Sequence, residues 1–381
     1  MRRFLAAFAV IFFLFSSLGS AVFAAEPLSV PAKSCILTDL NGTVLYEENA
    51  DTPMPPASIT KIMTLLLTFE AIDEGRLSLD QTVSCSEHAA SMGGSQIWLE
   101  PGEEMTLSDI IKGAAVNSAN DCAMVLAETV GGSEEDFVEM MNRKAQELHM
   151  TGTHFENPTG LDADGHLSTA RDIAIMSAEL LRHKKAAEYT SIWMDSLRNG
   201  KTALVNTNKL VRFYDGCIGL KTGTTDGAGS CLSAAAVRDR MTLIAVSMGS
   251  PTSKERFAAC RALLDYGFSS YELFSPVLSE EDLAPIPVKG GESKNVLLSF
   301  KVPDGVPIPK GRADEVKKEV SRSDFLAAPV SEGVEAGTAE FSLDGETLIR
   351  IPLQTAEEIP EVSFPFFLKT LWETIFPGMS R

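Results

Sequence analysis

Three short motifs carry side chains that together could perform acyl transfer. The first is Ser58-Ile59-Thr60-Lys61, at the start of an apolar-periodic helical stretch. A lysine three residues after a serine lies on the same helical face, so its amine can take the hydroxyl proton. The pattern is weak by itself, because it arises often by chance and a serine at a helix start commonly acts as a cap. It predicts an activated serine only in combination with further motifs.

The second motif is Ser118-Ala119-Asn120, within the stretch Ala114-Ala115-Val116-Asn117-Ser118-Ala119-Asn120-Asp121-Cys122. A polar cluster interrupts an apolar helical pattern here. Burying these polar side chains without partners would be costly, so we expect the cluster to line a cleft or a loop between helices. A polar loop without function is the alternative.

The third motif, Lys221-Thr222-Gly223-Thr224, ends a predicted strand and precedes a glycine-rich turn. An ammonium group and a hydroxyl on a strand edge can bind a carboxylate. Gly223, which follows them, lets a substrate backbone approach closely. A surface turn is the alternative interpretation, because a Lys-Thr-Gly triplet is common.

The order and spacing of the three motifs are those of penicillin-binding proteins and class A β-lactamases. The chain resembles the low-molecular-weight D-Ala-D-Ala carboxypeptidases from about Ser34 to its C-terminus. The resemblance extends to Asn157-Pro158-Thr159-Gly160-Leu161-Asp162, Ser168-Thr169-Ala170-Arg171-Asp172, and Ala328-Pro329-Val330 followed by Gly333. In two departures, Ala119 stands where many relatives have Gly and Thr224 where some have His. Both departures bear on rate and substrate preference.

This resemblance implies a serine-type D-alanyl-D-alanine carboxypeptidase. Such an enzyme removes the terminal D-alanine from peptidoglycan stem pentapeptides through an acyl-enzyme, needs no metal or cofactor, and is inhibited by β-lactams. Ser58 would be the nucleophile and Lys61 its base. Ser118 would relay a proton to the leaving D-alanine, and Asn120 would bind Lys61 and the substrate amide.

The resemblance also implies the groups that bind the substrate. Lys221 and Thr222 would bind the terminal carboxylate, and Gly223 would belong to the same substrate-binding strand, where it lets the substrate backbone approach. Arg256 lies at the family's carboxylate-binding arginine position. The backbone N–H groups of Ser58 and Thr224 would form the oxyanion hole.

Other functions remain open at this point. A β-lactamase or a DD-endopeptidase would use the same nucleophile. Class A β-lactamases have a deacylating glutamate followed four residues later by an asparagine. Glu156 invites this comparison, but Gly160 stands at the fourth position after it, so fast β-lactam hydrolysis is disfavoured. A non-catalytic penicillin-binding sensor or wall-binding module is a further alternative, although the intact reactive residues argue against inactivity. His166 invites comparison with a general base, but a histidine beside Gly165 is more often a loop residue.

Helical and strand patterns predict an α+β fold, and the resemblance implies that the helices pack on an antiparallel sheet. Helical patterns cover 59–71, 107–130, 134–148 and 253–266, and strand patterns cover 34–39, 43–46, 202–210, 216–221, 230–237 and 241–248. An Asn41-Gly42 turn joins the first two strands. We predict a catalytic domain over 25–272 and a smaller all-β domain over 276–357, where short Val- and Leu-containing runs alternate with Pro, Gly and charges.

The two ends of the chain differ from the rest. Arg2 and Arg3 precede an apolar run and small residues up to Ala24, which predicts a cleaved signal peptide over 1–24. A membrane-spanning anchor is the alternative, but the run is shorter than the ~20 residues a span needs. Residues 360–381 are predicted to form an amphipathic helix on a membrane surface, with packing against the β domain as the alternative. The expected location is the outer face of the cytoplasmic membrane, in the cell-wall compartment.

Composition narrows the class of partner. The formal net charge is −19, and no concentrated basic stretch is present, so nucleic acid is a poor candidate partner. Six cysteines are scattered without metal-ligand spacing. Cys217 and Cys231 could face each other across a hairpin, although buried free thiols are the favoured interpretation.

Overall fold

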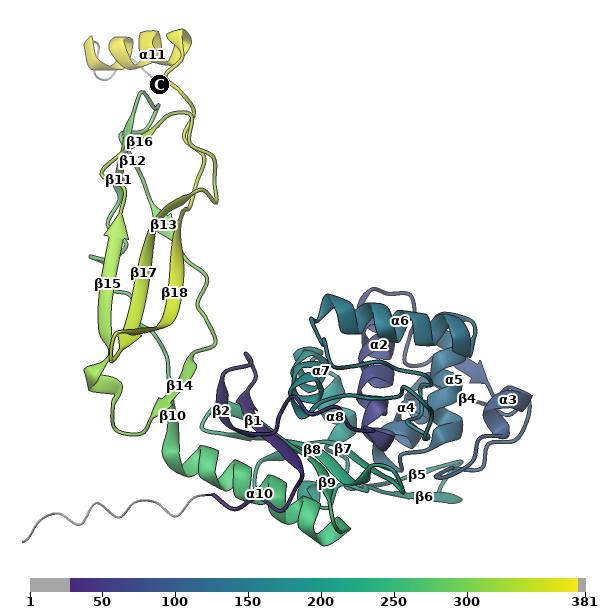
Figure 1. The fold of residues 1–381 in the computed structure, drawn as a ribbon. Coiled ribbons are helices and arrows are strands. Elements are labelled where there is room, and N and C mark those ends of the chain that lie inside the picture. Colours follow the sequence, from purple (N-terminus) through teal and green to yellow (C-terminus); the bar gives the residue numbers. More distant parts are fainter. Residues whose placement is uncertain (1–27, 376–381) are drawn as a thin grey trace, which may run out of the picture.

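The computed structural model describes residues 28–375 of the chain. Two parts are visible in Figure 1: a body of helices around a sheet, and an elongated β part that extends away from it. A short helix lies at the far end of the β part. The predicted signal peptide, residues 1–24, lies outside the described residues, as do residues 376–381 of the predicted anchor.

A five-stranded antiparallel sheet organises the first part, in the order β2-β1-β9-β8-β7. Its strands are β1 (Ser34–Asp39), β2 (Val44–Glu48), β7 (Cys217–Thr225), β8 (Gly229–Arg238) and β9 (Met241–Ser250). Successive side chains of a strand point to opposite faces. Accordingly, Ile36 joins the hydrophobic core on one face while Cys35 and Leu37 join the core on the other. Strand β7, which carries the Lys221 motif, is an edge strand of this sheet.

Helices cover both faces of this sheet (Figure 1). On one face lies α10 (Ser253–Ser270), and over the other lie α2 (Lys61–Asp73), α4 (Leu107–Val116), α5 (Asn120–Gly131), α6 (Glu134–Glu147), α7 (Ala170–Arg182) and α8 (Ala186–Thr190). Smaller elements are the 3-10 turn η1 (Ala57–Thr60), α3 (Glu87–Ala90), α9 (Leu210–Phe213) and the strands β3 (Thr82–Ser84), β4 (Glu104–Thr106), β5 (Met194–Leu197) and β6 (Thr202–Val205).

The predicted helical stretch 107–130 is two helices with a break at residues 117–119. Ser118 has a φ of 61°, which an α-helix does not allow, and Asn120 begins α5. The polar cluster therefore lies at a junction between helices, as its composition predicts. One strand prediction was too long: β6 ends at Val205, and Leu210–Phe213 is helical. The predictions omitted α7.

The β part contains three small sheets, ordered β10-β14, β12-β11-β16 and β13-β18-β17-β15. Its strands are β10 (Tyr271–Phe274), β11 (Ile286–Lys289), β12 (Asn295–Val296), β13 (Leu298–Ser299), β14 (Val306–Pro309), β15 (Lys317–Arg322), β16 (Leu326–Ala327), β17 (Glu335–Leu343) and β18 (Glu346–Thr355), with a 3-10 turn η2 (Ala313–Glu315). Alternating residues of β18, including Ile349, Ile351 and Leu353, point into a separate core.

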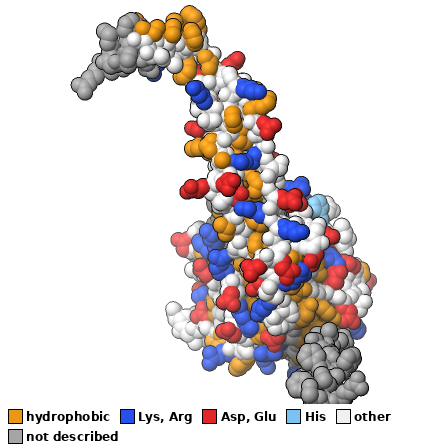
Figure 2. Space-filling model, turned by 90° about the vertical axis from the view of Figure 1, so that its left-hand side faces the viewer, with side chains coloured by type: hydrophobic (Ala, Val, Ile, Leu, Met, Phe, Trp, Pro, Cys, Tyr) orange, Lys and Arg blue, Asp and Glu red, His pale blue; other side chains and the backbone are white. Residues whose placement is uncertain are grey.

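The terminal helix α11 (Phe364–Ile375) presents apolar side chains to the surface. Figure 2 shows hydrophobic side chains gathered over this helix, whereas charges of both signs are mixed along the β part below it. These exposed residues are Phe364, Phe367, Leu368, Leu371, Trp372 and Ile375, each 43–72% exposed. Their spacing of three or four residues places them on one helical face. Within residues 28–375, no helix is both long enough and apolar enough to cross a membrane.

All six cysteines fall within the described residues, and each is a free thiol. Cys217 lies opposite Ala236 in the β7–β8 hairpin, while Cys231 lies opposite Gly223, so these two cysteines do not face each other. The interpretation as free thiols is confirmed. Burial is complete or nearly so for five of the six, and Cys217 is partly buried.

Candidate active site

Ser58 lies in the turn η1, immediately before α2, and its side chain is partly exposed. The preceding residue, Ala57, has a φ of 49° in the left-handed region. A residue with a Cβ is strained there, by roughly 1–3 kcal/mol, and persists only where its surroundings hold it. The backbone that carries Ser58 is therefore held by packing rather than by its own preference.

Lys61 is fully buried and its Nζ atom contacts three oxygen atoms. These are Ser58 Oγ at 3.1 Å, Asn120 Oδ1 at 2.5 Å and the carbonyl oxygen of Thr159 at 2.7 Å. Burial, and then the charge of Lys221, hold the pKa of Lys61 well below its ordinary value of 10.5. The neutral amine is therefore more accessible to Lys61 than to an exposed lysine.

The three contacts of Lys61 indicate where its lone pair points. A neutral amine has two N–H groups and one lone pair. The oxygens of Asn120 and Thr159 can only accept hydrogen bonds, so they take the two N–H groups. In the ammonium form Nζ donates to Ser58 Oγ as well; once the amine is neutral, its lone pair faces Ser58 and can accept the hydroxyl proton. This arrangement suits removal of the serine proton.

Asn120 is held in place by the loop of residues 91–103, which precedes β4. Its Nδ2 atom donates to the carbonyl oxygen of Gly93 at 2.7 Å, and its backbone N–H donates to that of Ser95 at 2.6 Å. Ser118 is 4% exposed and lies two residues earlier, at the helix junction. The second motif therefore presents Asn120 directly to Lys61, and Ser118 lies two residues before Asn120 along the chain.

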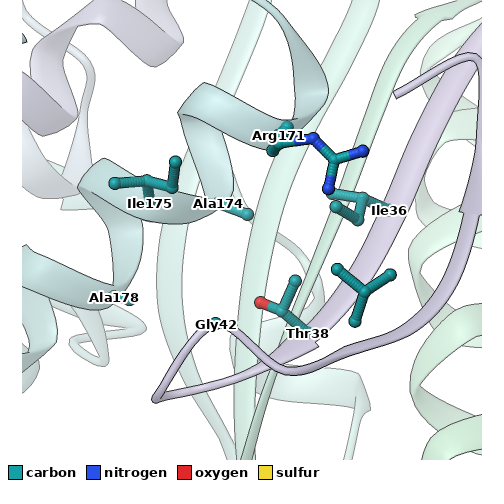
Figure 3. Close-up of a pocket in the computed structure, with 8 residues that line it drawn as sticks. Ile36, Thr38, Gly42, Arg171, Ala174, Ile175 and Ala178 are labelled. Carbon is teal, nitrogen blue, oxygen red and sulfur yellow. The ribbon is translucent and has the colours of Figure 1, made fainter. Parts of the chain in front are cut away.

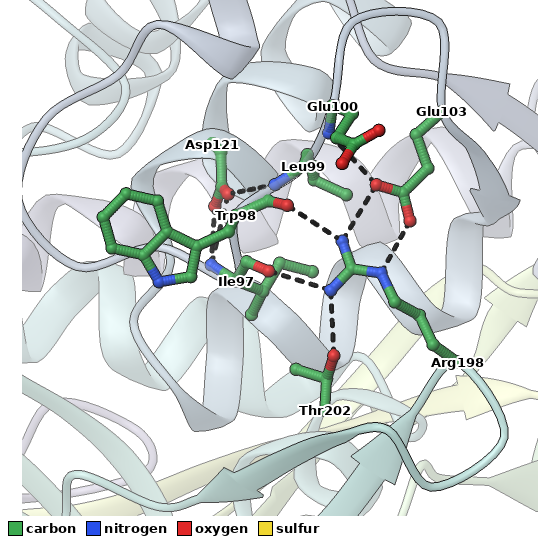
Figure 4. A network of polar contacts seen from close by, with 8 residues as sticks. All are labelled: Ile97, Trp98, Leu99, Glu100, Glu103, Asp121, Arg198 and Thr202. Carbon is green, nitrogen blue, oxygen red and sulfur yellow. Dashed lines mark hydrogen bonds and ion pairs between the residues drawn. The ribbon is translucent and has the colours of Figure 1, made fainter.

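A polar network holds that loop from the other side (Figure 4). The buried carboxylate of Asp121 accepts hydrogen bonds from the backbone N–H groups of Ile97 and Leu99. Arg198, on the β5–β6 hairpin, donates to the carbonyl oxygens of Ile97 and Trp98 and pairs with Glu103 at 2.6 Å. The loop is thus anchored at both α5 and the hairpin.

The third motif lies along β7. Lys221 is 1% exposed, and burial, with the charge of Arg256 second, lowers its pKa from 10.5 to about 7. Thr222 Oγ1 donates to Thr207 Oγ1 at 2.8 Å. Arg256 reaches the strand from α10, where its Nη1 atom donates to the Gly223 carbonyl oxygen at 2.9 Å and to Thr224 Oγ1 at 2.8 Å. Its Nε atom is buried without a partner.

Two glycines allow the serine turn to pack closely against its neighbours. A Cβ on Gly223 would lie 2.8 Å from the Pro56 carbonyl oxygen and 3.2 Å from the Ile59 nitrogen. A Cβ on Gly160 would lie 1.9 Å from the Ala57 carbonyl oxygen, and Gly160 also has a φ of +82°. Strand β7 and the 157–161 loop therefore both support the backbone of Ser58. For Gly223, this contact with the turn is a reason for glycine that the sequence did not reveal.

His166 has a structural role in this arrangement. Its Nδ1 atom accepts a hydrogen bond from the Glu156 backbone N–H, so its Nε2 atom carries the proton and donates to Thr60 Oγ1 at 2.8 Å. Burial lowers the pKa of His166 to about 4, which keeps the ring neutral. Both ring nitrogens are occupied by the protein, as expected for a loop residue.

Sequence reasoning assigned no role to two residues that contact the site. Thr159 supplies a carbonyl oxygen to Lys61, and Thr207 pairs with Thr222. Thr159 stands in a stretch that carried the family resemblance, which was the available signal. Thr207 gave none, because it lies in a segment predicted as strand and contacts β7 only through the tertiary fold.

Two further observations concern sites outside this cluster. A cavity of about 110 Å³ lies between the β1–β2 hairpin and α7 (Figure 3). Its wall is mostly apolar, and the Arg171 guanidinium beside it is already paired with Glu47 and Asp51. Among the described residues, no group of three or more His, Cys, Asp or Glu side chains is arranged to hold a metal ion.

Comparison with known proteins decides the family. Residues 21–252 match the D-alanyl-D-alanine carboxypeptidase family, and residues 271–361 match the C-terminal domain of penicillin-binding protein 5. The chain belongs to the D-alanyl-D-alanine carboxypeptidase family. A D-alanyl-D-alanine carboxypeptidase of Bacillus subtilis is 44% identical over 347 residues, which are 90% of this chain and 89% of that protein.

Solved structures agree with this assignment. The structure of penicillin binding protein 5 from Haemophilus influenzae has a TM-score of 0.78 and 31% identity, covering 89% of this chain and 100% of that one. Penicillin-binding protein D2 from Listeria monocytogenes, solved in an ampicillin-bound form, has a TM-score of 0.56 and 32% identity, covering 64% of this chain and 99% of that one. The predicted fold class is confirmed: helices on an antiparallel sheet, with a smaller all-β part. This carboxypeptidase is a serine-type hydrolase of peptidoglycan metabolism.

Proposed function

We propose that Ser58 is the nucleophile of this D-alanyl-D-alanine carboxypeptidase and that Lys61 is its general base. The observation that carries the proposal is the set of contacts around Lys61 Nζ. Two carbonyl oxygens occupy its N–H groups, and the Ser58 hydroxyl faces its lone pair. The serine proton moves to this amine as Oγ attacks the carbonyl carbon of the penultimate D-alanine.

The carboxylate of the terminal D-alanine binds along β7. Lys221 and Thr222 supply an ammonium group and a hydroxyl from the edge strand β7, and Arg256 adds a third donor from α10. Burial makes each charge-assisted hydrogen bond stronger than in water. The backbone N–H groups of Ser58 and Thr224 stabilise the oxyanion, since η1 and β7 are in contact at Gly223.

Proton return releases the terminal D-alanine and completes formation of the acyl-enzyme. Ser118 relays the proton from Lys61 to the nitrogen of the leaving D-alanine. Asn120 forms hydrogen bonds with both Lys61 and the substrate amide and so positions them relative to each other. Water then hydrolyses the acyl-enzyme. A penicillin acylates the same serine, because its strained amide and carboxylate resemble those of the substrate, and its adduct persists.

Release of D-alanine from an acetylated Lys-D-Ala-D-Ala peptide tests the proposed roles. Wild-type protein lacking residues 1–24 should release one D-alanine per peptide. Ser58→Ala should abolish release, and Lys61→Ala should slow acylation by about 10²- to 10⁴-fold, the usual contribution of positioned proton transfer. Undiminished release by Ser58→Ala would refute the assignment. Release from a crosslinked peptide dimer would identify the endopeptidase alternative.

The protein is further proposed to be exported and to bind a membrane surface through α11. The apolar face of α11 is exposed, and the helix lies at the end of the β part farthest from the five-stranded sheet (Figure 1). We propose that 1–24 is the signal peptide, 25–272 the catalytic domain, 276–357 the β domain and 360–381 the anchor. This arrangement would hold the active site away from the membrane and toward the wall.

Truncation separates the anchor from the active site. Removing the chain from Pro365 onward should abolish sedimentation with phospholipid vesicles and leave peptide cleavage within about twofold. Leu368→Asn with Leu371→Asn should weaken sedimentation without shortening the chain. Val302→Asn, which changes an exposed apolar residue of the β part, is the matched control. Continued vesicle binding by the truncated protein would contradict the membrane role of α11.

A further inference from the structure

The segment Asn206-Thr207-Asn208 lies between the second and third motifs and is held from both sides. The Asn206 side chain donates from Nδ2 to the carbonyl oxygens of Thr190 and Ile192, at 3.0 and 2.8 Å. It also accepts the backbone N–H of Asn208 at 2.8 Å. Asn208 in turn accepts the backbone N–H of Leu210 at 3.0 Å. Both asparagines are almost completely buried, so the backbone of Thr207 has little freedom.

Thr207 connects the two motifs through different groups. Its backbone N–H donates to the carbonyl oxygen of Val116, the last residue of α4 before the Ser118 junction. Its side-chain hydroxyl lies 2.8 Å from that of Thr222 on β7. The side chain of Thr222 is 4% exposed, whereas Thr207 is partly exposed. A substitution that removes only the Thr207 hydroxyl therefore leaves the backbone contact with α4 in place.

We infer that Thr207 is a positioning residue that orients the Thr222 hydroxyl toward the substrate carboxylate. The inference rests on the proposed role of Thr222 in binding that carboxylate. Without a substrate, Thr222 donates to Thr207. When a carboxylate is bound, Thr222 must direct its only proton to it, because a carboxylate only accepts. Thr207 then reverses its role and donates its own proton to the Thr222 oxygen.

The resulting chain runs from the Thr207 hydroxyl to the Thr222 hydroxyl and then to the carboxylate. Each hydroxyl in such a chain polarises the next one, and Thr222 keeps a partner in both states. No proton leaves either residue, since only the two hydroxyl hydrogens rotate. Thr207 therefore acts on substrates that carry a C-terminal carboxylate, and it acts mainly on their binding.

Thr207→Val tests this role, because valine has nearly the same shape as threonine and lacks the hydroxyl. We expect kcat/KM for an acetylated Lys-D-Ala-D-Ala peptide to fall about 3- to 10-fold, mostly through KM, as for the loss of one neutral hydrogen bond. Cleavage of the C-terminally amidated peptide should change less than twofold. Thr207→Ser should behave as wild type on both peptides. Thr338→Val, on the remote strand β17, is the matched control.

A double-mutant cycle with Thr222→Val isolates the coupling between the two hydroxyls. In the Thr222→Val background, Thr207→Val should cost less than twofold more, because the hydroxyl it supports is already gone. If Thr207→Val does not fold, Thr207→Ala removes the same hydroxyl and carries the same expectation. Equal losses on the carboxylate and amide peptides would overturn the inference, and so would independent effects in the cycle. Failure of the wild-type protein to cleave either peptide would instead refute the proposed function.

Discussion

Gly160 provides a sharp test of how the nucleophile is held. A Cβ at this position would lie 1.9 Å from the Ala57 carbonyl oxygen and 2.9 Å from the Ser58 nitrogen. Ordinary contact begins near 3.4 Å, so Gly160→Ala requires a displacement of about 1.5 Å. Either η1 moves and carries Ser58 with it, or the 157–161 loop moves and draws the Thr159 carbonyl oxygen away from Lys61. Both responses disturb the reacting groups.

The expected effect follows from this displacement. A shift of about 1 Å in reacting groups costs on the order of 10²-fold in rate, so acylation of Gly160→Ala by a penicillin should slow by about 100-fold. The backbone adds a separate cost. Because Gly160 has a φ of +82°, an alanine there is strained by roughly 1–2 kcal/mol. Unfolding measurements should detect this loss of stability.

Gly165→Ala is the matched control. Gly165 has a φ of +87°, so the same substitution carries a similar backbone strain. Its added Cβ would meet only the flexible end of Glu156, at 3.0 Å. Gly165→Ala should therefore lose comparable stability and keep its acylation rate within about threefold. Acylation is followed with a fluorescent penicillin, and unfolding with urea. Similar acylation rates for the two variants would refute the packing argument.

Three further predictions concern the charged side chains Lys61, Lys221 and Asp121. Acylation by a penicillin should accelerate with rising pH as Lys61 loses its proton, with a midpoint well below 10.5 because burial depresses its pKa; a midpoint near 10.5 in stopped-flow measurements would contradict a neutral base. Lys221→Ala should lower kcat/KM about 10- to 150-fold for a carboxylate peptide and spare its amide, the range expected for charge-assisted hydrogen bonds; equal losses would remove its role in carboxylate binding. Asp121→Asn should lower the free energy of unfolding by about 1–3 kcal/mol and slow acylation, because the buried Asp121 carboxylate anchors the loop that holds Asn120. Urea unfolding identical to wild type would show that the Asp121 carboxylate in the network of Figure 4 does not contribute to stability.

The sequence predicted the elements whose pattern is local. The short apolar runs of β1, β8 and β9 and the Asn41-Gly42 turn indicated the sheet strands, and the three motifs in order indicated the family. The polar residues at 117–121 indicated a cleft or a loop between helices, although the predicted helical stretch 107–130 ran through the break between α4 and α5. Each of these signals depends on neighbours along the chain, so no tertiary information was needed.

Contacts between distant segments could not be predicted in this way. The stretch 202–210 has a strand-like composition, yet its second half is not strand. There the Asn206 side chain donates hydrogen bonds to the carbonyl oxygens of Thr190 and Ile192 and so fixes the backbone next to Thr207. The requirement for glycine at 223 and 160 comes from the close approach of η1, which no local pattern reveals. The contact of Lys61 with Asn120 was predicted, whereas its contact with Thr159 was not. Thr159 contributes its backbone carbonyl oxygen, which every residue type has, so the residue type does not indicate this role.

The central claim is that Ser58, activated by a neutral Lys61, forms the acyl-enzyme. Intact-mass analysis of the protein lacking residues 1–24, incubated with a penicillin, tests it most directly. Wild type should gain the mass of one penicillin, and peptide mapping should place the adduct on Ser58. Ser58→Ala should gain nothing. An unmodified wild-type protein, or an adduct on any other residue, would contradict the account.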